Sequence, residues 1–410
     1  MALKVIVIGG GASGLFAAIR AAKLGAEVTV LEKMDRPGRK LAITGKGRCN
    51  LTTGHKLEKA ISEFGPNGKF LYSAFSRFFS GELIQFFEEL GIPVVLEQGK
   101  RYFPMSGKAS DVVDCLLEKL KEEGGVVKAG CRVLDLQHES DGGFLVMTDE
   151  TLYRADRVVL ATGGASYPGT GSSGDGYRLA GKLGHTIVKP SPALVPVELG
   201  GDIHKELSAM SLKNVEVDLY CGEKKIDGKF GDMMFTDFGM TGPAVLPLGK
   251  IVASGKHREG LILRLNLKPA LSEEILNARL IREFEEAGKR EVERIMRKLV
   301  PRRLVPVIIG LSGIDRKKRG CEITKKERLG IAAVLQRIDF EVSGTRPMSE
   351  AIVTAGGVVL GEVKPGTMES KLVGGLYICG ELLDLDAGTG GFNLQAAFST
   401  GYVAGESAAG

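Results

Sequence analysis

Continuous apolar runs and a helical repeat open this chain. Residues 5–8 are apolar throughout and 28–31 are apolar except for Thr29, as in strands buried on both faces, and the alanine-rich segment 12–23 between them has helical spacing. A further apolar run, RVVLATGG, occupies residues 157–164 and ends in a glycine pair. Strands of this kind that alternate with helices predict the α/β class, with a Rossmann-like parallel sheet covered by helices.

The turn between the first strand and the first helix carries the spacing GxGxxG. Gly9 allows a tight turn, Gly11 leaves room for a diphosphate to approach the backbone, and Gly14 lets the helix pack closely on the strand. Glu32 ends the second strand at the distance expected of an acid that holds the ribose hydroxyls of an adenosine. Strand, turn, helix, strand and acid together predict a dinucleotide-binding site at a helix N-terminus.

Shorter elements follow. Residues 35–53 are too rich in glycine and cations for a core strand, so they predict a long functional loop. Residues 110–123 have helical spacing, and we expect Ser110 to cap that helix. Strands are predicted at 126–136, 143–148 and 151–154.

From about residue 190 to 265 the pattern changes. Prolines punctuate this region, while 215–220 and 261–267 alternate between apolar and polar positions as half-buried strands do. Helical patterns follow at 272–286, opened by a Ser272 cap, at about 289–299, and at about 324–338, opened by the capping box Thr324–Glu327. From about Ala351 the chain returns to strands, glycine turns and a final helix.

We therefore expect three domains. The dinucleotide-binding domain comprises residues 1–190 and 345–410, the β-rich substrate domain 191–268 and 335–344, and the small helical domain 269–334.

Composition favours a cytoplasmic protein. Hydrophobic residues make up 43 % of the 410 residues and charged residues 26 %, which is ordinary for a globular chain. The six cysteines and five histidines show no metal-ligand spacing, so no metal site and a reducing compartment are expected. No apolar stretch is long enough to span a bilayer, and the N-terminus shows no export signal.

The net charge of +5 is concentrated in one region. Residues 279–328 hold sixteen Lys or Arg against eight Asp or Glu, so the rest of the chain carries an excess of three negative charges. Such a region suits a polyanion such as nucleic acid, although the solvated face of charged helices would have the same composition.

The remaining glycine motifs favour FAD as the dinucleotide. ATGG at 161–164, GLYICGE at 375–381 and a glycine-led final helix resemble the arrangement of two-dinucleotide-binding flavoproteins. There, Glu381 would approach the ribityl phosphate, and the N-terminus of the last helix would point at the flavin pyrimidine edge. The second GxGxxG, at 169–174, lacks a tight strand-to-helix turn and a following acid, so we expect no second nucleotide domain.

Four longer strings resemble one bacterial family of FAD-dependent oxidoreductases of the BaiN/RdsA type. They are KLAITGKGRCNLT (40–52), RYFPMSGKASDVV (101–113), MFTDFGMTGPAVL (234–246) and the segment 364–405. Members are labelled aminoacetone oxidase-like, BaiN-like or ribosomal RNA dihydrouridine synthases. The resemblance spans nearly the whole chain and implies a tightly bound FAD in a two-dinucleotide-binding domain, a β-rich substrate domain and a helical insert. Ala387 and Thr53 depart from the glycine and asparagine that the family pattern leads us to expect.

Together, the motifs and the resemblance indicate a set of cofactor-binding residues: Gly9, Gly11, Ala12, Ser13, Gly14, Glu32, Lys33, Arg39, Lys40, Gly45, Gly47, Arg48, Val133, Thr162, Gly163, Gly164, Gly380, Glu381, Gly391, Phe392, Asn393 and Leu394.

The resemblance suggests reduction of a uridine in 23S ribosomal RNA to dihydrouridine, with NAD(P)H as a transient reductant. Cys49 is the candidate proton donor if the loop 44–50 faces the flavin ring and Arg48 lowers the pKa of its thiol, and a buried, inert cysteine is the alternative. Arg48 is itself a candidate catalytic residue, or Arg48 and Lys46 would hold the flavin or a substrate phosphate. Thr236 and Thr241 are candidate substrate contacts or ordinary turn hydroxyls. RNA phosphates would be bound by a set of cations: Arg290, Arg294, Arg297, Lys298, Arg302, Arg303, Arg316, Lys317, Lys318 and Arg319.

Two other functions stay open at this point. One is a flavin-dependent oxidase of a small amine that produces hydrogen peroxide, for which the basic region would be a solvated surface. The other is a flavin-bearing, ribosome-binding protein with little turnover. The sequence does not indicate an oligomeric state.

Overall fold

The computed structural model describes residues 2–140, 142–256 and 260–410. The chain divides into two compact units, each with its own apolar core. Unit 1 comprises the chain up to Ala193 together with Met348–Gly410, and unit 2 comprises Leu194–Pro347. The division into three domains that the sequence suggests stays a prediction. No helix within the described ranges is both long and apolar enough to cross a membrane.

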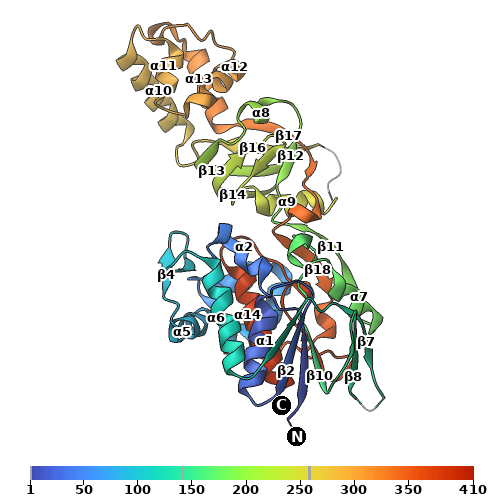
Figure 1. The fold of residues 1–410 in the computed structure, drawn as a ribbon. Helices are drawn as coiled ribbons and strands as arrows, with labels where there is room; N and C mark the ends of the chain where they lie inside the picture. The colour runs from blue at the N-terminus through green and yellow to red at the C-terminus, as the bar shows by residue number, and fades with distance from the viewer. Residues whose placement is uncertain (1, 141, 257–259) are drawn as a thin grey trace. The chain divides into compact units, whose positions relative to one another are not determined.

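Unit 1 is built on a five-stranded sheet in the order β19-β10-β1-β2-β6 (Figure 1). All neighbours in this sheet run parallel. Strands β1, β10 and β19 are buried apolar runs, as expected where both faces are covered, whereas the edge strand β6 is largely exposed. Their bounds are β1 (Lys4–Ile8), β2 (Glu27–Glu32), β6 (Val126–Ala129), β10 (Arg157–Leu160) and β19 (Leu376–Ile378).

Helices α1 (Ala12–Lys23) and α14 (Phe392–Ala408) pack closely in unit 1, although they come from opposite ends of the chain (Figure 1). Most residues of α14 are buried, including the polar residues Gln395, Ser399 and Thr400. Two glycines allow the close approach. A Cβ on Gly401 would lie 2.2 Å from the Ser13 carbonyl oxygen, and one on Gly405 would lie 2.1 Å from that of Ala17.

Smaller sheets and helices complete unit 1. The antiparallel sheets are β3 (Thr52–Thr53), β5 (Arg101–Pro104) and β4 (Val94–Glu97); β7 (Val133–His138), β8 (Phe144–Thr148) and β9 (Leu152–Ala155); and β11 (Ile187–Ala193) with β18 (Val353–Val358). The α-helices are α2 (Arg39–Gly47), α3 (Leu57–Ser62), α4 (Tyr72–Arg77), α5 (Ser80–Glu89), α6 (Ala109–Glu122) and α7 (Asp175–Lys182). The 3₁₀ helices are η1 (Gly65–Leu71), η2 (Pro168–Thr170), η5 (Met348–Glu350), η6 (Leu360–Glu362) and η7 (Gly380–Leu382).

Three local predictions for unit 1 are wrong. Residues 35–53 do not form one loop, because left-handed Gly38 starts helix α2. The strand expected at 126–136 is two strands, since β6 ends at Ala129 and the chain turns at Gly130, whose φ is 74°. Helix α6 begins one residue before Ser110, and its N-cap is Lys108.

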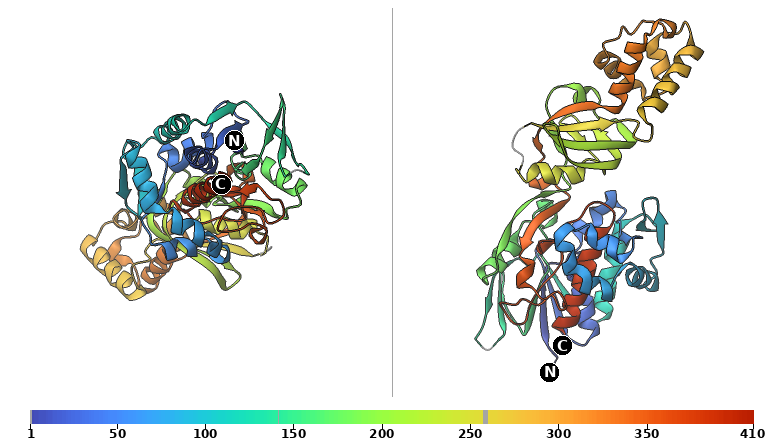
Figure 2. Two further views of the ribbon diagram at one scale, coloured as in Figure 1. Left: turned by 90° about the horizontal axis from the view of Figure 1, so that it is seen from below. Right: turned by 180° about the vertical axis from the view of Figure 1, so that it is seen from behind.

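Unit 2 contains a closed antiparallel barrel in the order β12-β15-β14-β13-β16-β17 (Figure 2). Inward positions alternate with exposed ones, as the half-buried pattern of residues 215–220 and 261–267 predicts. The strands are β12 (Val197–Leu199), β13 (Ser211–Cys221), β14 (Lys224–Phe235), β15 (Gly239–Thr241), β16 (Leu261–Asn266) and β17 (Ile338–Thr345), with helices α8 (Ile203–Glu206) and α9 (Leu246–Ala253).

A group of helices lies between β16 and β17 in the sequence and gathers at one end of the barrel within unit 2 (Figure 2). The predicted caps at Ser272 and Thr324 are confirmed, since their side chains accept from Ile275 N and Glu327 N. The helices are α10 (Glu273–Ala287), α11 (Val292–Met296), η3 (Arg302–Leu304), α12 (Val305–Leu311), η4 (Gly320–Glu322) and α13 (Lys325–Gln336). The predicted fold class is thus confirmed: a Rossmann-like parallel sheet, a β-rich part and a helical insert.

Candidate functional site

The glycine turn after β1 leaves an open space at the start of α1. A Cβ on Gly9 would lie 2.6 Å from the Ala161 carbonyl oxygen, and one on Gly14 would lie 1.9 Å from that of Gly9. At Gly11 the same Cβ would meet no atom of the described chain within 4 Å. No side chain of the described residues caps α1, and its first turn holds no acid. The free N–H groups and the helix dipole at this end favour an anion.

Glu32 ends β2 beside this turn, where its carboxylate is nearly buried. One oxygen accepts from Gly10 N and the other from Met34 N, both at 2.8 Å. The segment leading to Val133 passes alongside, because Cys131 N donates to the Glu32 carbonyl at 2.9 Å. The acid is thus fixed at the carboxyl end of the strand, where dinucleotide-binding folds hold a ribose.

Thr162, in the glycine pair segment after β10, presents an unsatisfied hydroxyl. Its Oγ1 is buried and has no hydrogen-bond partner within the described chain. A Cβ on Gly176 would lie 1.9 Å from this oxygen, so α7 also depends on a glycine here. A buried hydroxyl without a partner costs about 1–3 kcal/mol, which a polar atom of a ligand would recover. The open space at Gly11, the fixed acid and this hydroxyl all fit a bound dinucleotide.

The second glycine motif, residues 169–174, forms a strap that packs near Glu32. A Cβ on Gly171 would lie 2.9 Å from Met34 Cγ and 3.7 Å from Glu32 Oε1. Asp175 anchors the end of the strap by ion pairs with Lys33 at 2.7 Å and Arg132 at 3.3 Å. Burial raises the pKa of Asp175, but hydrogen bonds from Lys33, Ser173 and Arg132 outweigh it and hold that pKa below its ordinary value.

A second polar group joins α2 to the C-terminal part of unit 1. Lys40 Nζ donates to Glu381 Oε2 at 2.7 Å and to Ser166 Oγ at 2.6 Å. The other oxygen of Glu381 accepts from Thr354 N at 2.8 Å. Lys40 and Glu381, two predicted cofactor residues, are therefore in contact although they are far apart in the sequence. Ser166 and Thr354 were missed, because no motif marks an isolated hydroxyl in a loop or strand.

The start of α14 is held by two asparagines. Gly391, with φ of 90°, precedes the helix, and no side chain of the described residues caps it. Asn393 bonds both the N–H and the carbonyl of Ala387 at 2.9 Å, so the loop before the helix is closed on itself. In the amide orientation that satisfies its neighbours, Asn50 accepts from Gly391 N at 2.9 Å. Neither Ala387 nor Thr53 has the positive φ that would demand glycine or favour asparagine.

Helix α2 ends in a kink at Thr44, Gly45 and Lys46, where the backbone leaves helical geometry. Gly45 and Lys46 are left-handed, with φ of 58° and 60°. The kink turns the chain towards Arg48, whose guanidinium pairs with Glu97 and lies 4.4 Å from the ring centre of Phe103.

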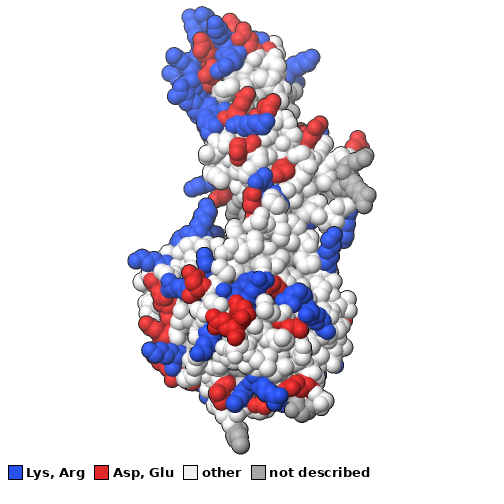
Figure 3. All heavy atoms as spheres, turned by 45° about the vertical axis from the view of Figure 1, so that its right-hand side comes forward, with Lys and Arg blue, Asp and Glu red and all other residues white. Residues whose placement is uncertain are grey.

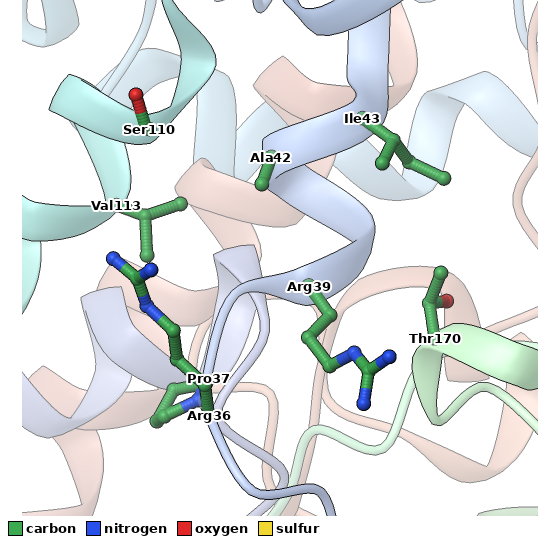
Figure 4. A pocket seen from close by; sticks show the side chains of 8 residues that line it. All are labelled: Arg36, Pro37, Arg39, Ala42, Ile43, Ser110, Val113 and Thr170. Carbon is green, nitrogen blue, oxygen red and sulfur yellow. The ribbon is translucent and has the colours of Figure 1, made fainter.

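A pocket of about 240 Å³ lies beside α2 (Figure 4). In this view Arg36 extends towards Val113, and Arg39 extends on the side of Thr170. Pro37, which also lines the pocket, packs against the glycine turn, since a Cβ on Gly10 would lie 2.8 Å from Pro37 Cβ. Arg39 thus faces a space that adjoins the turn.

The prediction that Arg48 lowers the pKa of Cys49 is wrong. Cys49 is fully buried, and burial raises the pKa of its thiol to about 12, with a smaller opposite effect from Thr44. Arg48 is engaged by Glu97 instead. The alternative stated above, a buried and inert cysteine, matches these properties.

The buried thiols predict a loss of stability at alkaline pH. The pKa of Cys49 and that of Cys379 are both raised to about 12, whereas a thiol in the unfolded chain ionises at about 8.5. Above that pH only the unfolded state releases these protons, so each thiol lowers the free energy of unfolding by about 1 kcal/mol per pH unit. Urea midpoints measured in reductant from pH 7 to 10.5 should show this fall. We expect Cys49→Ala to flatten it and Cys321→Ser, at an exposed site, to leave it unchanged.

The two threonines singled out from the sequence lie in unit 2. Thr236 forms a tight turn with Gly239: its Oγ1 accepts from Gly239 N at 3.0 Å, and its own N–H donates to the Gly239 carbonyl at 2.8 Å. Thr241 ends β15 opposite Met234. Thr236 thus has the properties of an ordinary turn hydroxyl. All predicted cofactor-binding residues lie in unit 1, whereas all predicted RNA-binding cations lie in the helical part of unit 2.

The chain belongs to the HI0933-like protein Rossmann domain family, whose model matches residues 3–407. The predicted family is therefore confirmed. The chain is 31 % identical over 410 residues to the 3-dehydro-bile acid delta(4,6)-reductase of Clostridium scindens, with 99 % of each chain covered. It is 30 % identical to the ribosomal RNA dihydrouridine synthase of Haemophilus influenzae, with 97 % of this chain and 96 % of that one covered. Both names agree with the prediction of an oxidoreductase.

Solved structures share the fold at low identity. One is a flavocytochrome c3 fumarate reductase, with a TM-score of 0.53 and 18 % identity over 99 % of this chain and 78 % of that one. Another is the 3-ketosteroid-delta4-(5alpha)-dehydrogenase of Rhodococcus jostii, with a TM-score of 0.52 and 16 % identity over 100 % of this chain and 97 % of that one.

Proposed function

We propose that this protein is an FAD-dependent oxidoreductase that reduces a uridine in 23S ribosomal RNA to dihydrouridine with electrons from NAD(P)H. Similarity to named relatives does not choose the substrate, because identity to the bile acid reductase and to the ribosomal RNA enzyme is nearly equal. The observation that carries the choice is the basic helical part of unit 2, where Lys and Arg outnumber acids two to one over residues 279–328 (Figure 3). A bile acid carries a single carboxylate and needs no such set of cations, whereas an RNA backbone, with a charge on every phosphate, would gain from it.

The residues of unit 1 support FAD as the cofactor. The N–H groups at the start of α1 would bind the diphosphate over Gly11, and Glu32 would hold the adenosine ribose. Lys40 and Glu381 would contact the middle of the cofactor. The uncapped start of α14 would face the flavin ring, where its dipole favours the negative charge of the reduced ring.

The proposed reaction saturates a carbon–carbon double bond conjugated to a carbonyl. Bound FAD, once reduced, would supply a hydride to C6 of the uracil ring, and C5 takes a proton. The named bile acid relative would act on a similar bond, since a 3-oxo group conjugated to the delta(4,6) double bonds activates them in the same way. We also propose Arg48, in unit 1, and Thr241, in unit 2, as catalytic residues. Cys49 is not proposed again, because its buried thiol does not ionise near neutral pH.

Anaerobic stopped-flow spectroscopy tests this function. The enzyme is reduced with NADPH or NADH, and the flavin absorbance is followed after mixing with 23S ribosomal RNA that lacks dihydrouridine. We expect reoxidation together with one dihydrouridine per flavin oxidised. Reoxidation only by a conjugated 3-oxo steroid, or only by oxygen with turnover of a small amine, would contradict the proposal. A flavin that stays reduced with every substrate would indicate a binding protein instead.

A further inference from the structure

Two basic segments that lie apart in the sequence are paired in the helical part of unit 2. Residues 288–292 and 317–321 run antiparallel: Val292 N donates to the Lys318 carbonyl at 2.8 Å, and Gly320 N donates to the Arg290 carbonyl at 2.9 Å. Glu291 and Arg319 form a β-bridge between them. The pairing brings one basic run, Lys289 and Arg290, beside another, residues 316–319.

This pair of segments is a fixed platform. Gly320 is buried, and a Cβ there would lie 2.7 Å from Ile295 Cδ1, so the second segment packs directly on α11. Lys318 anchors the segment by bonds of 2.6 and 2.8 Å to Glu327, which also closes the capping box of α13. The exposed cations on the platform are therefore held at defined backbone positions.

Internal contacts separate the cations of this region, including those predicted from the sequence to bind RNA, into two classes, and only the second class is proposed below to bind RNA. One class is held by other groups of the protein: Arg297 and Arg316 by Glu293, Lys298 by Glu283, and Arg303 by the carbonyls of Glu206 and Ser208. The other class is exposed and has no side-chain partner among the described residues. Five of its members lie on the paired segments or on the adjoining first turn of α11, and we name them the basic ridge: Lys289, Arg290, Arg294, Lys317 and Arg319.

We propose that the basic ridge binds the phosphate backbone of a double-helical segment of RNA. This inference deepens the proposed function and rests on it for the choice of RNA. Three of the five side chains are arginines with no internal carboxylate partner in the described chain. Their planar guanidinium groups are therefore available for bidentate hydrogen bonds to phosphate. Glu291 is the one acid within the two paired segments, so positive charge dominates them.

The two paired segments expose no aliphatic or aromatic side chain, which argues for a ligand that is bound through its phosphate backbone. Val292 is the only aliphatic residue of the two segments, and it is buried. A protein partner or a membrane would require an exposed apolar anchor. Stacking on single-stranded bases would require exposed aromatic rings, but the sole aromatic residue in the sequence from 269 to 337 is Phe284, which is buried. A duplex recognised through its phosphates needs neither.

Two triple variants that lose the same amount of positive charge compare the basic ridge with cations held by acids. Arg290→Gln, Arg294→Gln and Arg319→Gln together remove three ridge cations, whereas Arg297→Gln, Lys298→Gln and Arg316→Gln remove three cations held by acids. Full-length holoenzyme and a labelled RNA hairpin with a long stem are used at several salt concentrations. We expect the ridge variant to bind the hairpin at least about 30-fold more weakly than wild type. The slope of log affinity against log salt concentration should be smaller by about three in this variant. The matched variant should stay within about 5-fold of wild-type affinity.

Cys321 gives a readout that does not depend on catalysis. It is exposed, and its N–H bonds the Gly288 carbonyl at 3.0 Å, so the thiol-bearing residue adjoins the ridge. We expect the hairpin to slow maleimide labelling of Cys321 in wild type but not in the ridge variant, with Cys221 in the barrel as the internal reference. Stronger protection by polyuridine or by anionic vesicles than by the hairpin would overturn a duplex ligand.

The outcomes separate the ridge from the proposed function. An enzyme that forms dihydrouridine, while its ridge variant binds the hairpin as wild type does, overturns the ridge and leaves the function standing. A protein whose ridge binds the hairpin but which never reduces a uridine supports the ridge and contradicts the function. Equal loss of affinity in both triple variants would also overturn the ridge, because it would show a response to net charge alone.

Discussion

Replacement of Gly11 by valine is expected to give a folded protein that has lost FAD. Gly11 has φ of −84° and ψ of −168°, an extended conformation open to any residue, and an added Cβ meets no described atom within 4 Å. The added Cβ therefore meets no described atom of the protein, and we expect the valine side chain to fill the space proposed for the diphosphate. A steric overlap that costs about 3 kcal/mol weakens FAD binding about 100-fold.

The measurements are flavin absorbance of the purified protein, FAD titration and thermal unfolding. Gly81→Val is the matched control, since Gly81 is an exposed residue in the first turn of α5, and the described atoms leave its Cβ position free. We expect the control to stay yellow. A Gly11→Val protein with normal FAD affinity would show that the diphosphate does not lie over this turn. A Gly11→Val protein that fails to fold would contradict the steric argument.

Gly405→Ala is expected to lower the stability of unit 1 by about 3 kcal/mol. Its Cβ would lie 2.1 Å from the Ala17 carbonyl oxygen and 2.7 Å from Ala17 Cα, so α14 has to move away from α1. Backbone atoms cannot yield as a flexible side chain does, and close-packed cores respond to added volume with strain. For a unit of this size the loss corresponds to a fall of about 6 °C in the unfolding temperature.

The same substitution has the opposite sign at Gly181. This residue is exposed in α7, its φ is not positive, and its Cβ position is free of described atoms. Alanine there restricts the unfolded chain and should stabilise unit 1 by about 0.5 kcal/mol. Calorimetry of both variants with FAD bound checks the pair. Gly405→Ala with unchanged stability would mean that α1 and α14 are less closely packed than the glycine contacts indicate.

The parts of the fold that follow local rules could be predicted from the sequence. The strand, turn and helix at residues 4–23 have apolar periodicity and glycine spacing that agree with each other. The helix starts at Ser272 and Thr324 follow because a side-chain oxygen at a cap bonds an N–H three residues away. The count of charged residues along the chain also locates the basic region.

Contacts between distant segments could not be predicted in the same way. The sequence of Cys49 shows a neighbouring arginine, but burial of the thiol depends on the packing of the whole unit, and burial decides its pKa. The Lys40–Glu381 bond and the antiparallel pairing of residues 288–292 with 317–321 join segments that no local pattern relates. The kink in α2 was missed because two adjacent left-handed residues, one of them Lys46, are rare in any helix.

The most direct test of the central claim is the dihydrouridine content of 23S ribosomal RNA from cells with and without the gene for this protein. Nucleoside mass spectrometry of purified 23S RNA measures it. We expect that one dihydrouridine is lost on deletion and is restored by the wild-type gene but not by the Gly11→Val variant. Identical dihydrouridine content in the two strains would contradict the proposed function.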